Sequence, residues 1–434
     1  MTAAPESRES QPADSPAATP PAATPPAATP PATGRRAARI WVGLTTWLRA
    51  PTPPLRAGER GLLSVIIGLM STWVIFQALN QNFLTTGNLS NLVLQITAVG
   101  IMAIGITLVL LLGEVDLSIG SVSGLAAAIL AVLTIRHGVP EVLALILVVL
   151  VGLGIGALHG AVWTRIGVPS FVVTLAGLIG WQGLHLYLLS PQGTINISDH
   201  SIIVALTREY LPAVAGWLLA AVMIGCYLAA TIVDARRRSV AGLPRSALRH
   251  RAVRLVLLSA GVGLVVGVLN SGRGVPIALG LLVVFAAGFD LMLRRTRFGR
   301  SIIAIGGNVE AARRAGIPVN RVRVTVFALG SAMAAIGGIL ATSRGLAATQ
   351  STGGNDVLLF AIAAAVIGGV SLFGGRGSTY GALLGIAVIG TISNGMDLFE
   401  LDSSVRFMIT GTVLLVAVSV DSLSRRHRQL PGRT

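Results

Sequence analysis

Two carboxylates separated by a single residue interrupt an otherwise apolar stretch, at Glu114 and Asp116 in the segment 113–121. Paired carboxylates can perform general acid–base chemistry, but nothing else in the sequence supports such a reaction. A charge at membrane depth is costly unless it is paired, hydrated or functional. Together with Ser118, these carboxylates therefore have one of two roles. They fix a break between two helices, or they line a solute pathway.

A second polar group follows in the segment 168–177, where Pro169 opens a helix. Ser170 and Thr174 lie one turn apart and therefore share a helix face. Their hydroxyls either contact a solute or bond back to the preceding backbone turn. Gln182 continues the same apolar run.

A glycine-rich stretch, 368–378, resembles a phosphate-binding loop only superficially, because it lacks the G-x-x-x-x-G-K-[ST] pattern. The chain contains no lysine, since all 33 of its basic residues are arginines. The sequence therefore excludes a Walker A ATPase site. The single cysteine, Cys226, excludes an intrachain disulfide and leaves no metal-binding framework, so we expect neither a metal nor a cofactor.

One polar stretch between two hydrophobic runs, 297–318, carries its own helix start and stop signals. Asn308 is a good N-cap residue, and Glu310 follows in the first turn, where the helix dipole favours a carboxylate. Arg313 falls near the other end, and Gly316 can adopt the left-handed conformation that closes a helix. The predicted helix has about two turns, which is too short to be stable alone. We therefore expect it to dock on another surface.

The composition determines which elements must position these groups. Hydrophobic residues make up 53% of the chain and charged residues 12%, with a mean hydropathy of +0.78. Soluble domains have about 25% charged residues. The 434 residues provide about ten to twelve spans of roughly 20 residues each. The predicted fold is an all-α, polytopic helix bundle in a lipid bilayer, with about 10–12 transmembrane helices.

The charge pattern predicts the orientation of this bundle. The net charge is +16, but the arginines cluster at the ends of hydrophobic runs, which indicates the positive-inside rule and no nucleic-acid partner. With twelve spans and both termini cytoplasmic, 28 of the 33 arginines lie inside. The short spans seven, ten and eleven could instead be re-entrant if protein shields them. The expected spans are 61–80, 92–112, 117–135, 142–163, 168–189, 212–233, 255–269, 275–293, 324–342, 357–373, 378–393 and 405–420.

The ends of the chain differ from its apolar body. Residues 1–60 are rich in proline, alanine and threonine and then in arginine, and we expect a disordered cytoplasmic tail. A transmembrane domain at 61–421 follows and contains two basic loops, 234–254 and 294–323. Residues 422–434 form a basic cytoplasmic tail. The acidic loop 394–404 either meets a partner protein or is solvated.

The stretch 298–317 resembles the cytoplasmic coupling loop of ABC-transporter permeases from the bacterial monosaccharide importers of the ribose, xylose and galactoside type. Four short motifs, FG, GGN, EAA and GI, stand in the order found in that family. In the family, the EAA-containing helix lies in a groove on the ATPase subunit. The resemblance implies an ATPase-coupling role for Phe298, Gly299, Gly306, Gly307, Asn308, Glu310, Ala311, Ala312 and Gly316.

The resemblance covers roughly residues 60–425 and is strongest to the xylose permeases. These share the arginine-rich insert after the sixth span and the extra span before the motif GRGVP. The acidic segment and the segment opened by Pro169 also resemble the family. We take six residues as candidates for the translocation pathway: Glu114, Asp116, Ser118, Ser170, Thr174 and Gln182.

The resemblance implies a membrane-spanning permease subunit of an ATP-driven importer in the bacterial inner membrane. Its substrate would be a monosaccharide, a pentose such as xylose. The chain would not be an enzyme, because a separate ABC ATPase subunit binds the ATP. The other implied partners are an extracytoplasmic sugar-binding protein and a second copy of the permease. The alternative is an ion-coupled secondary transporter, which needs carboxylates near mid-membrane, whereas Glu114 and Asp116 lie near a span end.

Overall fold

The computed structural model describes residues 57–242, 248–402, 404–412 and 415. The expected N-terminal tail, apart from its last four residues, and the expected C-terminal tail lie outside the described residues. So do parts of the loop 234–254 and of the last expected span. The described part of the chain is almost entirely helical and contains four strands of two or three residues. The predicted all-α membrane fold is confirmed.

The described helices follow the expected order of apolar runs. Two of them, α4 and α5, continue into short π-helical turns, Val132–Arg136 and Val162–Ile166. The helices are α2 (Ala57–Leu79), α3 (Thr86–Leu111), α4 (Ile119–Ala131), α5 (Glu141–Ala161), α6 (Ser170–Leu189), α7 (Ile202–Arg208), α8 (Ala213–Val240), α9 (Leu248–Asn270), α10 (Ile277–Arg295), α11 (Arg297–Gly307), α12 (Val309–Arg314), α13 (Val319–Gly345), α14 (Asn355–Ile367) and α15 (Thr379–Leu398).

Eight helices in the described part of the chain are long and apolar enough to cross a membrane: α3, α4, α5, α6, α8, α10, α13 and α15. Shorter apolar segments occur in α2, α9 and α14. The expected span of 357–373 is wrong in length, because α14 ends at Ile367 and Gly369 follows with a φ of 86°. The short α14 contributes Ala361 and Ala364 to the core, so protein shields it as a short membrane segment requires.

Helix α13 forms the centre of the bundle and packs against α3, α4, α5 and α7. Its contact with α5 depends on three glycines spaced four residues apart, at Gly152, Gly156 and Gly160. A methyl group at Gly156 would overlap with the carbonyl oxygen of Phe327 on α13. Such small residues let membrane helices approach closely, where dispersion forces and backbone contacts replace the hydrophobic effect. The α5–α13 pair is therefore closely packed, backbone against backbone.

The two expected basic loops are shorter than the sequence suggested. Helix α8 continues to Val240, so Arg236 and Arg237 lie on its last turns and not in a loop. The loop 294–323 is folded into two helices, α11 and α12, between the ends of α10 and α13. Amphipathic helix formation in the first half of this segment was not predicted, because its glycines argue against a helix.

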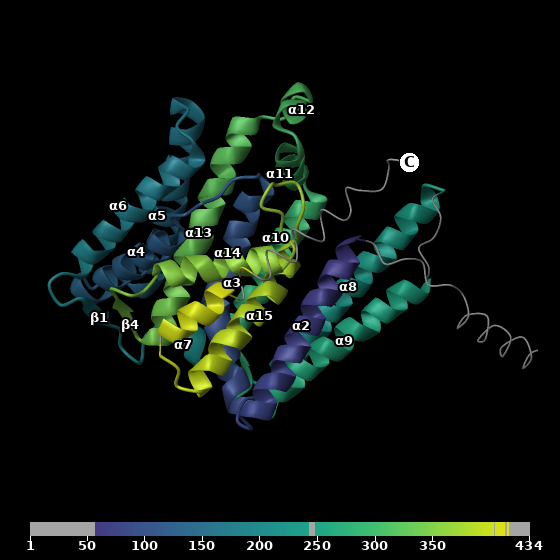
Figure 1. Ribbon diagram of the computed structural model, residues 1–434, viewed down its shortest axis with the longest axis horizontal. Coiled ribbons are helices and arrows are strands. Elements are labelled where there is room, and N and C mark those ends of the chain that lie inside the picture. Colours follow the sequence, from purple (N-terminus) through teal and green to yellow (C-terminus); the bar gives the residue numbers. More distant parts are fainter. Residues whose placement is uncertain (1–56, 243–247, 403, 413–414, 416–434) are drawn as a thin grey trace, which may run out of the picture. The chain divides into compact units, whose positions relative to one another are not determined.

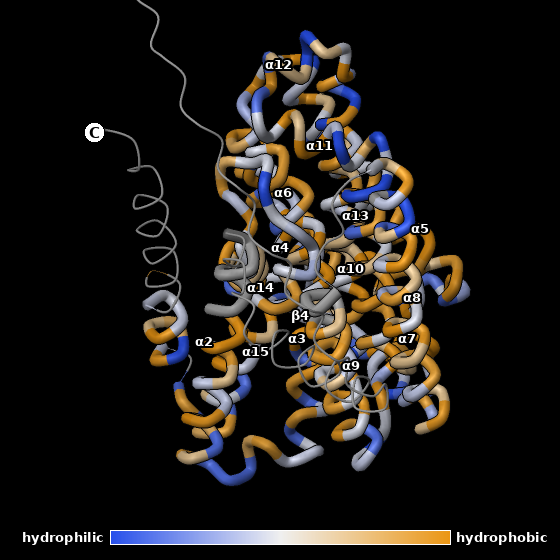
Figure 2. Tube along the Cα trace, turned by 90° about the vertical axis from the view of Figure 1, so that its right-hand side faces the viewer, coloured by the Kyte–Doolittle hydropathy of each residue, from blue (hydrophilic) through white to orange (hydrophobic). Residues whose placement is uncertain are grey.

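The two ends of the bundle are formed by different helices. Helices α11 and α12 lie together at one end, whereas α7 lies near the other (Figures 1 and 2). Hydrophilic residues gather around α12, and apolar residues dominate the long helices (Figure 2). Two antiparallel strand pairs also tie distant segments together: β1 (Thr194–Asn196) with β4 (Ala347–Thr349), and β2 (Tyr210–Leu211) with β3 (Val275–Pro276).

Candidate functional site

The segment that joins α10 to α13 is capped at each helix start. Thr296 accepts a hydrogen bond from the backbone N–H of Gly299 at 3.0 Å and starts α11. Asn308 accepts one from the N–H of Ala311 at 2.9 Å and starts α12. Gly316 has a φ of 78°, in the left-handed region. The predicted N-cap, the short helix and its glycine stop are thus confirmed.

The nine residues assigned to coupling divide into two groups. The residues that face the protein are Gly299 and Ala312, which are buried, and Phe298 and Gly306, which are half-buried. The other five are exposed: Gly307, Asn308, Glu310, Ala311 and Gly316. The first group fixes the segment to the bundle, and the second group presents a polar surface that a partner can contact.

The inward group attaches α11 to two long helices. Ile302 and Ile305 of α11 are buried in an apolar cluster with Leu111 at the end of α3 and Val326 on α13. Gly306 touches the backbone of both Leu111 and Gly375. The N–H of Gly375 also donates a hydrogen bond to the carbonyl of Leu111 at 2.9 Å. The α11–α12 segment is therefore packed onto the end of α3 and the loop that follows α14.

On the exposed side, α12 presents a charged face. The carboxylate of Glu310 lies 2.6 Å from a guanidinium nitrogen of Arg313, three residues later. Both side chains are more than half exposed, so this pair adds little to the stability of the helix. Its charges remain accessible to a partner.

The two carboxylates at 114 and 116 lie in the turn between α3 and α4. Asp116 is buried and accepts hydrogen bonds from the backbone N–H and the hydroxyl of Ser118, at 2.8 and 2.6 Å. Ser118 directly precedes α4, so these bonds hold the chain at the start of that helix. This geometry supports the first of the two predicted roles, a fixed break between helices.

Glu114 links three helices. Its carboxylate accepts a hydrogen bond from the Ser170 hydroxyl at 2.5 Å and lies 3.7 Å from the Arg323 guanidinium. That guanidinium also lies over the ring of Trp163, 4.1 Å from its centre. Burial raises the pKa of the Glu114 carboxyl above its ordinary value, while the Ser170 hydroxyl and the Arg323 charge act in the opposite direction.

A histidine that was not predicted connects this turn to α6. The Trp181 indole N–H donates to Nε2 of His159 at 2.9 Å, and Nδ1 of His159 lies 3.4 Å from the Ser118 hydroxyl. Because an indole N–H can only donate, Nε2 must accept, which leaves Nδ1 to carry a proton toward Ser118. No motif in the sequence indicates this pairing, because it joins side chains of three consecutive helical segments that lie 22 and 41 residues apart.

The remaining candidates for the pathway do not share one surface. Thr174 is fully buried and its hydroxyl lies 3.2 Å from the Phe171 carbonyl, so it bonds back to the preceding turn. Gln182 is exposed on the outer face of α6. Five of the six candidates therefore gather around the α3–α4 turn, and Gln182 lies apart.

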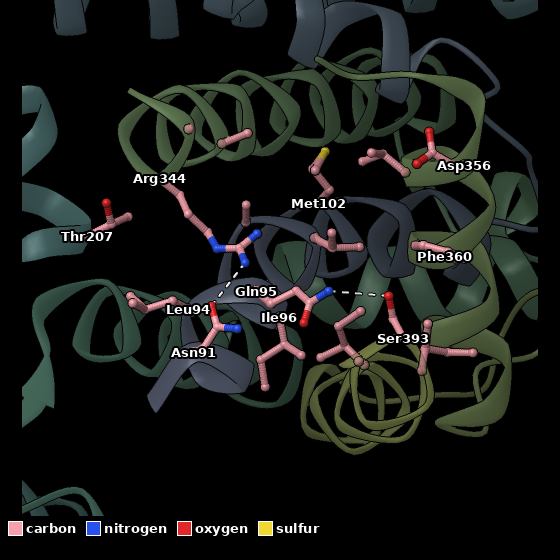
Figure 3. A pocket seen from close by; sticks show the side chains of 18 of the residues that line it. Asn91, Leu94, Gln95, Ile96, Met102, Thr207, Arg344, Asp356, Phe360 and Ser393 are labelled. Carbon is pink, nitrogen blue, oxygen red and sulfur yellow. Dashed lines mark hydrogen bonds between the residues drawn. The ribbon is translucent and has the colours of Figure 1, made fainter. Parts of the chain in front are cut away.

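A cavity of 1020 Å³ lies between α3, α7, α13, α14 and α15. None of the six pathway candidates lines it. Its polar lining includes Asn91 and Gln95 on α3, Arg344 on α13 and Asp356 on α14 (Figure 3). The sequence gives one signal for this lining, which is that Asn91 and Gln95 place polar side chains one turn apart in an otherwise apolar helix.

The polar walls of the cavity are joined by hydrogen bonds. The Gln95 amide nitrogen donates to Ser393 at 3.3 Å and to Asp397 at 3.0 Å (Figure 3 draws the first bond). Asp397 also forms an ion pair with Arg406. The expectation of an acidic loop at 394–404 is thus partly wrong, because Asp397 belongs to α15 and contacts other groups of the protein.

The chain is similar in sequence to known proteins. Residues 88–418, most of the chain, match the family described as the permease component of branched-chain amino acid transport systems. The chain belongs to this permease family. It is a multi-pass protein of the bacterial inner membrane, and its relatives are transport permeases and not enzymes. Membership implies an ATPase subunit and a periplasmic binding protein as partners.

The names of the individual relatives refer to the transport of pentoses, xylose or ribose. The permease is 36% identical to the xylose transport system permease protein of Escherichia coli (strain K12), over 84% of this chain and 92% of that protein. It is 32% identical to the xylose transport system permease protein of Haemophilus influenzae, over 84% and 97% of the two chains. The ribose import permease protein of Bacillus subtilis is 32% identical, over 83% and 92%. No solved structure matches the chain. The predicted kinship with xylose- and ribose-type permeases is confirmed.

Proposed function

We propose that this permease is the membrane subunit of an ATP-driven importer for a monosaccharide, a pentose such as xylose. The observation that carries the proposal is its similarity to xylose permeases over 84% of the chain. The family description names amino acids, but the individual relatives named above are pentose permeases. The chain itself performs no covalent chemistry.

The α11–α12 segment is the proposed contact with the ATPase. It lies at one end of the bundle, is fixed by its apolar side to α3 and α13, and presents Glu310 and Ala311 outward. A docking helix needs both properties, because force must pass from the partner into the transmembrane helices. We assign this end to the cytoplasm, in agreement with the arginine distribution. The cavity residues Arg344 and Arg406 then lie toward the periplasm.

Two copies of the permease, a pair of ATPase subunits and one sugar-binding protein make up the proposed complex. ATP binding and hydrolysis by the partner would shift the permease between inward- and outward-open states. The ion-coupled alternative is disfavoured, because Glu114 and Asp116 are held in a turn between helices and are engaged by Ser170, Arg323 and Ser118.

The test is uptake of radiolabelled D-xylose into proteoliposomes that contain the permease, its ATPase and its binding protein. We expect uptake with ATP, no uptake with a non-hydrolysable analogue, and no effect of an ionophore that collapses ion gradients. D-ribose and L-leucine serve as competing solutes. Uptake that needs an ion gradient and no ATPase would instead establish a secondary transporter.

A further inference from the structure

One wall of the cavity combines a carboxylate with an aromatic ring. Asp356 and Phe360 both line the cavity, and they lie four residues apart on α14, so they share a helix face (Figure 3). Asp356 stands in the first turn of α14, and its side chain is half-buried. Among the described residues, its carboxylate has neither a hydrogen bond nor an ion pair. It is therefore free to accept hydrogen bonds from a solute.

The opposite wall belongs to α3 and has a fixed hydrogen-bonding pattern. Asp397 is held by Arg406 and can only accept, so the Gln95 side chain must direct its NH₂ group toward Asp397. Asn91 lies one turn before Gln95 and accepts a bond from Arg344 at 3.2 Å. The amide groups of α3 are thus pre-oriented across the cavity from α14.

These two walls match the chemistry of a sugar. A monosaccharide has hydroxyl groups that donate to carboxylates and exchange bonds with amides, and a C–H face that packs on an aromatic ring. A carboxylate and a ring one helical turn apart can engage adjacent parts of one small ring. The volume of 1020 Å³ is at the upper end of the range for small-molecule sites, so the solute does not fill the cavity. Weak binding suits a passage that must also release its solute.

We infer that Asp356 and Phe360 form the sugar-contacting wall of this cavity, with Gln95 and Asn91 facing them. This assignment rests on the proposed function. Asp356 accepts hydrogen bonds from sugar hydroxyls, and Phe360 packs against the sugar C–H face. The Asn91 amide nitrogen, which has no hydrogen bond among the described residues, donates to the solute from the other side, whereas the Gln95 amide nitrogen stays bonded to Ser393 and Asp397. Specificity then lies partly in the permease, in addition to any in its binding protein.

The experiment is saturation-transfer NMR on the full-length permease in lipid nanodiscs, with D-xylose as the probe and D-ribose, D-galactose and L-leucine as comparisons. The variants are Asp356→Asn and Phe360→Leu, both close to the original residues in shape. The matched control is Leu359→Ala, which changes an exposed residue of α14 that does not line the cavity. Each variant is checked for its elution volume and its unfolding temperature.

We expect saturation transfer from the unmodified permease to D-xylose and binding about tenfold weaker in Asp356→Asn, because a hydrogen bond to a charged group is commonly worth at least that factor. Phe360→Leu should also lose most of the signal, and Leu359→Ala should keep it. Equal signals in all four proteins, or transfer to L-leucine in place of the sugars, would overturn the assignment.

ATP-dependent uptake separates this inference from the proposed function. If the complete complex imports D-xylose and both cavity variants import it at the unmodified rate, the function stands and the cavity assignment fails. If the unmodified complex imports no monosaccharide, the proposed function itself fails.

Discussion

Gly306 of α11 lies directly against the carbonyl oxygen of Leu111, the last residue of α3, with no room for a side chain between them. The next residue, Gly307, has no atom of another segment within 4 Å of the place where a Cβ would stand. Two adjacent glycines therefore occupy opposite environments. One joins the segment α11–α12 to a transmembrane helix, and the other faces outward.

Replacing Gly306 by alanine should separate α11 from α3. The new methyl group would overlap with backbone atoms that cannot move as a side chain does, at a cost of about 1–3 kcal/mol. We expect a lower unfolding temperature and a loss of ATP-dependent uptake. Gly154→Ala is the control and should leave both unchanged, because this exposed glycine of α5 has no atom within 4 Å of the place where a Cβ would stand. Equal behaviour of the two variants would show that the contact with Leu111 is unimportant for coupling.

Changes on the exposed side of α12 should disturb partner binding and leave the fold intact. Glu310→Lys places a cation at the positive end of the helix, which is unfavourable by up to about 1 kcal/mol. Gly316→Val places a β-branched residue where φ is 78°, at a cost of about 1–2 kcal/mol. We expect both variants to reach the membrane but to lose the ATPase on co-purification and to stop transport.

The control for these variants is Glu400→Lys, which makes the same charge change at an exposed residue outside the α11–α12 segment. It should retain the ATPase. If Glu310→Lys and Gly316→Val also keep the ATPase bound and transport at the normal rate, α12 is not the coupling element.

The stability of the permease should depend on pH through Glu114. Its pKa is raised by burial above 4.5, so ionisation is harder in the folded state than in the unfolded chain. The stabilising contribution of the Glu114 carboxyl is therefore fully present below pH 4.5, and it is lost as the pH rises through the pKa of this carboxyl in the folded state. Glu114→Gln cannot ionise. The measurement is the unfolding temperature of both proteins, recorded by tryptophan fluorescence at a series of pH values. The unfolding temperature of the variant minus that of the unmodified protein should increase as the pH rises across this window. A decrease of this difference with rising pH would contradict this account.

Removal of residues 1–50 should leave transport intact. We predict this from their proline-rich composition alone, which offers little apolar surface for a core. The measurement is ATP-dependent uptake by the shortened chain, normalised to its amount in the membrane by immunoblot. Reduced uptake at an equal membrane level would assign this tail a role in transport.

Local signals in the sequence predicted local structure well. The Asn308 cap and the Gly316 stop follow from rules that involve only neighbouring residues, and both occur in the structure. The structure also contains an ion pair between Asp290 and Arg294, with 2.8 Å between the carboxylate and the guanidinium, and the four-residue spacing on one helix accounts for it. The apolar runs likewise identified the long helices, because the bilayer imposes their length and composition.

Contacts between distant segments could not be predicted. The Glu114 partner, Arg323, stands on a helix far away in the sequence, and no residue near either one indicates the pairing. The expectation that Gln182 lines the pathway has no support in the structure, because an apolar run does not show which face of a helix is outward. Asp356 was missed as a cavity residue, since its neighbours resemble the start of an ordinary span.

Helix α3 reaches from the cavity to the coupling segment without a break. Asn91 lines the cavity in the second turn of the helix, and Leu111 meets Gly306 at the other end, a distance of about 30 Å along the axis at 1.5 Å per residue. A single rod of this kind behaves as a lever. A tilt about its midpoint moves its two ends in opposite directions. A push on α11 by a partner would therefore displace Asn91, at the far side of the pivot, directly and without any relay of side-chain rearrangements through the interior.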